Sequence, residues 1–142
     1  MRSLTTAADR FRDAHGLPAT LDAACDAFEQ ILTVIAANEA TTSTGLALTF
    51  LFAATQAANG RDAMLFAPSL PPMPLHAPAP AGEHRQPGDQ DIKTTIAGVA
   101  ELLATGLGNT ATTTADGADR AACHDAAACA TRIHYLLTRP GP

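Results

Sequence analysis

Apolar side chains recur with the spacing of an α-helix along most of this chain. The pattern is clearest over residues 20–40, where apolar residues return every three or four positions and the intervening positions are mostly polar or charged. The apolar members of this stripe are Leu21, Ala24, Cys25, Phe28, Ile31, Leu32 and Ile35. Similar stripes occupy residues 91–107 and 117–138. Each stripe predicts a helix that turns one face toward a core.

Residues 44–59 are apolar on nearly every helical face, and they contain no charged residue. A helix of this kind must be covered on all sides, so it is expected to be the central helix or to be covered by a partner chain. Asn59 and Gly60 predict its end. A shorter, charged stretch over residues 6–15 ends before Gly16 and predicts a peripheral N-terminal helix.

A proline-rich segment over residues 67–90 separates these helices from the last two, and it holds seven of the ten prolines. Such a density of proline excludes a helix. An extended chain of about twenty residues, at roughly 3.1 Å per residue, is much longer than a fifteen-residue helix of roughly 22 Å. The segment can therefore cross a bundle, so that the helices on either side of it run parallel.

The predicted fold is a single domain over residues 1–142, an all-α, alanine-rich bundle of four main helices with a short N-terminal helix and a long proline-rich crossover loop. The composition agrees, because 46% of the residues are hydrophobic but only 4% are aromatic. Small side chains let helices approach closely. The glycines at positions 106 and 108 are expected to end the helix over residues 91–107.

Charge and hydropathy exclude several partners. The net charge is −5 and the nine basic residues are scattered, so no basic stripe is available to neutralise nucleic-acid phosphates. The longest nearly uncharged apolar run, residues 45–58, is shorter than the roughly 18 residues of a membrane span. The N-terminus also lacks the apolar region of a signal peptide. A cytoplasmic protein that binds neither nucleic acid nor membrane is expected.

The stretch CHDAAACATRIH, residues 123–134, gathers two cysteines and two histidines. On a helix, Cys123 and His134 lie about 16 Å apart along the axis, too far to share a zinc ion whose ligands sit about 2 Å away. No metal site and no cofactor is expected. A reactive cluster of Cys123, His124 and Asp125 remains an alternative, because Arg120 lies three residues before Cys123 and could lower the pKa of that thiol.

The expected function is that of a non-enzymatic cytoplasmic interaction or regulatory protein, which binds itself as a homodimer or binds another protein. Its interface is placed on the over-apolar helix, at Leu46, Leu48, Phe50, Leu51 and Phe52. An alternative is a helical bundle that binds a small molecule in an apolar pocket lined by Phe28, Phe50, Phe52, Met64 and Phe66. A Cys/His-based enzyme centred on residues 123–125 is the third interpretation.

Overall fold

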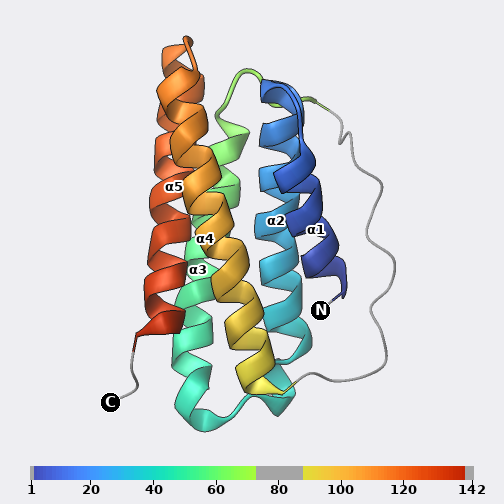
Figure 1. Cartoon of the computed structure of the whole chain (residues 1–142). Helices are drawn as coiled ribbons and strands as arrows, with labels where there is room; N and C mark the ends of the chain where they lie inside the picture. Colours follow the sequence, from blue (N-terminus) through green and yellow to red (C-terminus); the bar gives the residue numbers. More distant parts are fainter. Residues whose placement is uncertain (1, 73–87, 140–142) are drawn as a thin grey trace.

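Helices form nearly all of the regular structure in the computed structural model, which describes residues 2–72 and 88–139 (Figure 1). In chain order the elements are α1 (Arg2–Asp13), α2 (Leu17–Ala37), the 3-10 turn η1 (Glu39–Thr41), α3 (Thr44–Leu65), α4 (Asp89–Thr113) and α5 (Gly117–Thr138). The predicted all-α bundle of four main helices with a short N-terminal helix is confirmed. Most of the predicted crossover loop lies outside the described residues.

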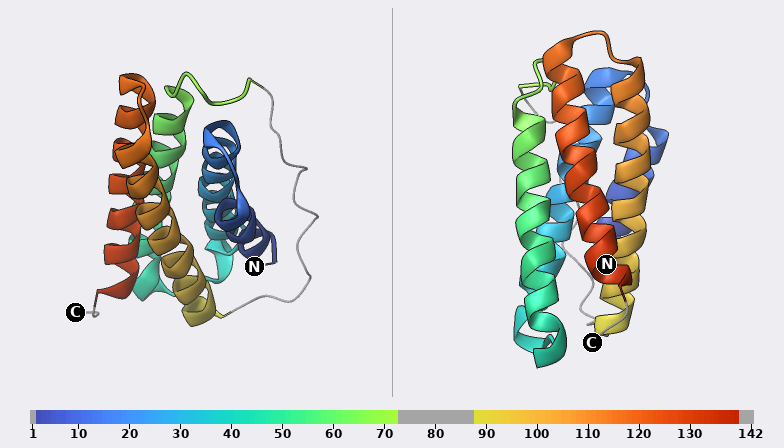
Figure 2. Two further views of the ribbon diagram at one scale, coloured as in Figure 1. Left: turned by 45° about the horizontal axis from the view of Figure 1, so that its top comes forward. Right: turned by 90° about the vertical axis from the view of Figure 1, so that its left-hand side faces the viewer.

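The two helices that flank the proline-rich segment run parallel, as its length allows. In Figure 1, α3 and α4 both run upward while α2 and α5 run downward. Helix α5 packs against both α3 and α4, and α2 packs against α3 (Figure 2). Helix α1 contacts α2 and α4 and covers the gap between them. One side of α3, facing away from α2 and α5, is therefore left open.

The core is built from small and aliphatic side chains, because the chain offers few aromatic ones. Its largest fully buried apolar side chains are Phe28, Leu4, Leu21, Ile31, Met64, Ile92, Ile96, Leu103, Leu107 and Ile133. Alanines fill much of the remaining buried surface and let the helix axes lie close together. The apolar stripe predicted on α2 faces this core, with Leu32, Ile35 and Cys25 at its partly buried edge.

Two predicted helix ends are corrected, because α3 and α4 continue through their glycines to Leu65 and Thr113. Gly60 lies against the ring of Phe28, where a β-carbon would be 2.5 Å from Cε1 of that ring. Gly106 lies in the same way against the ring of Phe11. These glycines do not end helices; each leaves space for an aromatic ring from a neighbouring helix. The other predicted boundaries differ from the observed ones by a few residues.

A buried carboxylate joins the chain after α3 to the first turn of α5. Asp119 accepts hydrogen bonds from the backbone N–H of Ser69 at 3.0 Å and from the Ser69 hydroxyl at 2.6 Å. The backbone N–H of Asp119 in turn donates to the Asp116 carboxylate at 2.9 Å, which caps α5 as expected from the sequence. The contact fixes where the chain leaves α3 relative to α5.

Candidate functional site

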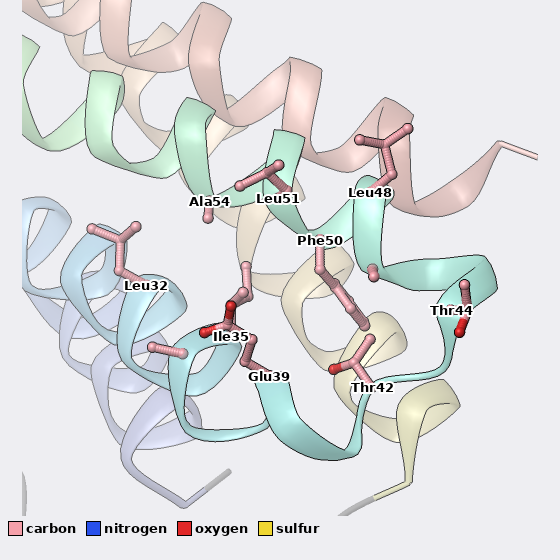
Figure 3. A pocket seen from close by; sticks show the side chains of 11 residues that line it. Leu32, Ile35, Glu39, Thr42, Thr44, Leu48, Phe50, Leu51 and Ala54 are labelled. Atoms are coloured by element: carbon pink, nitrogen blue, oxygen red, sulfur yellow. The ribbon is translucent and has the colours of Figure 1, made fainter.

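A groove of about 660 Å³ opens between the end of α2 and the start of α3 (Figure 3). Most of its lining is apolar, and the lining residues are Leu32, Ile35, Ala36, Glu39, Thr42, Thr44, Ala47, Leu48, Phe50, Leu51 and Ala54. Ala36, Ala47 and Ala54 carry only a methyl group, which leaves the space between the two helices unfilled. The groove is thus a consequence of small residues at facing positions of α2 and α3.

The open side of α3 continues from this groove as an exposed apolar ridge. Leu48 and Leu51 are each 59% exposed and Phe52 is 49% exposed, whereas Phe50 is buried at the same level of the helix. We call the groove together with Leu48, Leu51 and Phe52 the α3 face. Single exposed apolar side chains are common, but several next to an apolar groove are typical of a binding surface.

Charged groups border the α3 face but are absent from its centre. No charged residue occurs over residues 40–60 of the sequence. On the α2 side, exposed Glu39 lines the end of the groove. On the α5 side, Arg132 donates to the Gln56 side chain at 3.4 Å, and the Arg139 guanidinium lies 5.8 Å from the centre of the Tyr135 ring. At the start of α3 the face therefore has a carboxylate at its α2 edge and guanidinium groups at its α5 edge.

The aromatic residues expected around one pocket are placed in separate surroundings. Phe28 and Met64 are fully buried in the core, and Phe66 is 80% exposed just beyond the end of α3. Phe50 lines the groove, while Phe52 lies on the exposed ridge. These side chains do not line a common cavity. Of the interface residues expected on α3, Leu48, Leu51 and Phe52 are exposed together, whereas Phe50 is buried and Leu46 is partly buried against the core.

The cluster at the start of α5 does not form an activated thiol. Cys123 is buried, whereas His124 and Asp125 are exposed. Burial, and then the neighbouring Asp119 carboxylate, raise the pKa of the Cys123 thiol. The Arg120 guanidinium, expected to lower that pKa, instead donates to the carbonyl oxygens of Thr114 and Ala115, at 3.3 and 3.0 Å. The prediction that Arg120 lowers the pKa of Cys123 is therefore wrong.

The other two thiols are in similar surroundings, and all three cysteines are free. Burial, followed by the carboxylates of Glu29 and Asp22, raises the pKa of Cys25 to about 11. Burial also raises the pKa of Cys129, although Arg132 opposes this effect. Within residues 2–72 and 88–139 there is no group of three or more His, Cys, Asp or Glu side chains that could hold a metal ion.

These surroundings predict slow alkylation of Cys25 in the folded protein. Only the thiolate reacts, and with a pKa of about 11 only about one thiol in a thousand is ionised at pH 8. The rate should rise about tenfold per pH unit up to pH 11, and unfolding in urea should accelerate the reaction at pH 8 on the order of a hundredfold. Iodoacetamide labelling followed by mass spectrometry would measure this. Equal rates in folded and unfolded protein would contradict the burial of Cys25.

The α2 residues that line the groove, Leu32, Ile35 and Ala36, are not among the site residues predicted from the sequence. Their signal is present, because Leu32 and Ile35 extend the apolar stripe of α2 to the end of the helix. What the pattern does not show is that these side chains line an open groove beside Ala36. An apolar stripe on α2 that continues to the level of small residues on the neighbouring helix, here Ala47 and Ala54 of α3, is the sign that could have identified it.

Helix α3 is apolar on nearly all sides, yet no helix in the described part of the chain is long and apolar enough to cross a membrane. The chain matches no protein-family model, and neither a curated protein nor a solved structure is significantly similar to it. The α3 face and the charges at its edges are therefore the observations on which a function can be proposed.

Proposed function

We propose that this chain is a non-enzymatic cytoplasmic interaction protein that self-associates through the α3 face. The observation that carries the proposal is the exposed ridge of Leu48, Leu51 and Phe52 beside an open apolar groove. Each of these side chains exposes apolar area to water, and burying apolar surface contributes roughly 25 cal/mol per Å². The raised pKa of each of the three thiols supports a protein without thiol chemistry.

The charge distribution of the α3 face is suited to binding a second copy of the chain. Two copies that each carry a net charge of −5 repel one another over most of their surface. The α3 face has an uncharged centre, so two copies can meet there without bringing like charges together. A different acidic protein could meet the uncharged centre of this face for the same reason. A basic protein would be attracted more strongly to the acidic surface elsewhere on this chain.

A second copy also fits this face in shape. An isologous interface needs a surface that is complementary to itself, which means a protrusion beside a hollow. Phe52 protrudes on one side of α3, and the groove lies on the other side, toward α2. Rotation by a two-fold axis that runs along α3 places the ridge of each copy over the groove of the other. Helix α3 then has all of its apolar faces covered, which its sequence requires.

The proposal predicts that a charge on the ridge abolishes self-association. Leu48→Asp and Phe52→Asp should each turn a dimer into a monomer, or weaken the dimer at least tenfold, because a carboxylate would be buried without a partner. Both positions are about half exposed in the single chain, so the fold of the monomer should be retained. Sedimentation velocity over a range of protein concentrations would measure the mass.

Thr94→Asp is the matched control, since it adds the same charge at an exposed position of α4, away from the α3 face. This variant should stay dimeric, and circular dichroism should show the same helix content in all three variants. If the unchanged protein is a monomer at every concentration up to about 1 mM, where binding would be weaker than about 4 kcal/mol, self-association is ruled out.

A second candidate is a bundle that binds an apolar small molecule, and the size of the groove favours it. A volume of about 660 Å³ lies within the range of roughly 300–1,000 Å³ that ligand pockets span. In this case native mass spectrometry of the purified protein should show a monomer with extra organic mass. Leu51→Asp should then remove the extra mass, whereas Phe52→Asp, which lies outside the groove, should leave it in place.

A further inference from the structure

We infer that the two copies pair with their α3 helices parallel, so that the α2 edge of each copy lies against the α5 edge of the other. The inference rests on the proposed self-association and adds the orientation and the groups that select it. Two-fold symmetry has two limiting orientations in which one α3 face can meet another. An axis along α3 keeps the helices parallel and places α2 opposite α5. An axis across α3 makes the helices antiparallel and places α2 opposite α2.

The charges at the α2 edge disfavour the antiparallel arrangement. Glu39 lines the end of the groove. Exposed Glu29 lies seven residues before Ala36, a groove residue, and therefore on the same side of α2. In the antiparallel arrangement these carboxylates of one copy approach those of the other. Like charges placed opposite one another at an interface are strongly unfavourable.

The charges at the α5 edge favour the parallel arrangement. Arg132 is level with Gln56, to which it donates a hydrogen bond. Helix α5 runs antiparallel to α3, so Arg139 lies about 10 Å further toward the end of the bundle where α3 begins. Glu39, in the turn η1 between α2 and α3, lies at this same end (Figure 3). Rotation about a two-fold axis along α3 does not change the position of a residue along the helix axis. It therefore brings Glu39 of each copy near Arg139 of the other.

Glu39 also needs such a partner if the groove is to be covered. No ion pair joins it to a cation within the described ranges 2–72 and 88–139. A carboxylate that loses water against an apolar ridge without a counter-charge is costly to bury. The Arg139 guanidinium, which lies over the Tyr135 ring on α5, supplies this counter-charge. Asp125, further up α5, would meet the Glu29 end of α2, so close contact is limited to the first half of α3.

Charge reversal in a mixture tests the arrangement. Glu39→Arg should weaken the dimer at least tenfold, because the new arginine of each copy then faces Arg139 of the other, and Arg139→Glu should weaken it similarly by opposing two glutamates. When the two variants are mixed, each heterodimer has two contacts between opposite charges. The new arginine at position 39 faces the new glutamate at position 139, and the unchanged Arg139 faces the unchanged Glu39. The mixture should therefore associate about as tightly as the unchanged dimer. Sedimentation of each variant alone and of the equimolar mixture would measure this. Both positions are exposed, so neither change should disturb the fold.

The outcomes separate this inference from the proposed function. If the unchanged protein is a monomer, both fail. If it is a dimer that Phe52→Asp dissociates, but the mixture associates no better than either charge variant alone, only the parallel arrangement is overturned. Disulfide cross-linking of single-cysteine additions gives a second readout. In the parallel pair Thr44→Cys and Leu51→Cys, both in the first half of α3 and both lining the groove, should each link to itself, whereas in an antiparallel pair only one of the two can, because they lie about 10 Å apart along the helix.

Discussion

Replacing Gly60 by alanine is expected to destabilise the fold by about 2–3 kcal/mol, as overpacking of a core typically does. The added β-carbon would lie 2.5 Å from Cε1 and 2.6 Å from Cζ of Phe28, well inside van der Waals contact. The ring of Phe28 is fully buried between α2 and α3, so it cannot turn out into solvent to make room. The helices must therefore separate, and the packing of α2 against α3 is lost in part.

Gly98→Ala is the matched control and should have the opposite effect. Gly98 lies within α4 on an exposed turn, where a β-carbon meets nothing within 4 Å. Alanine there should stabilise the protein by about 0.5–1 kcal/mol, because glycine costs that much inside a helix. Urea denaturation of both variants would measure the two effects. A Gly60→Ala protein as stable as the original would show that Phe28 does not fill this site.

A third protein separates the steric effect from a general loss of helix stability. Phe28→Leu alone should destabilise the fold, because it removes buried apolar area and leaves a cavity. Combined with Phe28→Leu, Gly60→Ala should cost much less than it does alone, since the smaller side chain leaves space for the methyl group. Simple addition of the two effects would mean that residues 28 and 60 do not contact each other.

The helices could be predicted from the sequence because their apolar stripes are local and regular. Residues 20–40 and 117–138 needed no information beyond their own periodicity. The sequence also allowed the parallel course of α3 and α4, since the proline-rich segment is long enough to cross the bundle, but it did not require that course. The glycine positions could not be predicted in this way. Gly60 has the sequence of a helix end, and only Phe28, far earlier in the chain, explains why the helix continues.

The candidate site could be predicted in part for the same reason. The excess of apolar residues on α3 is enough to indicate an open face, and Leu48, Leu51 and Phe52 lie on it. The groove depends on which alanines of α2 and α3 face one another, which is a property of packing. The acidic and basic edges depend on the positions of η1 and the end of α5 relative to α3. Neither could be obtained from periodicity within one segment.

Replacing Asp119 by alanine is expected to lower the free energy of unfolding by about 3 kcal/mol, because hydrogen bonds to charged groups contribute about 1.5–3 kcal/mol each. Asp119 is only 2% exposed, and its two carboxylate oxygens accept from the N–H and the hydroxyl of Ser69. Alanine would leave the Ser69 N–H without its acceptor in a partly buried place. It would also remove a negative charge from the first turn of α5, where the helix dipole favours one.

Conservative variants show whether the hydrogen bonds or the charge carry this effect. Asp119→Asn keeps one acceptor oxygen and should cost less than alanine, and Ser69→Ala removes only the hydroxyl and should cost about 1–2 kcal/mol. In a double-mutant cycle, Ser69→Ala should add little to Asp119→Ala, since the bond is already lost. Asp125→Asn, at an exposed site on the same helix, should change stability by less than about 0.5 kcal/mol. If Asp119→Ala were as mild as this control, the chain after α3 would not be held by α5.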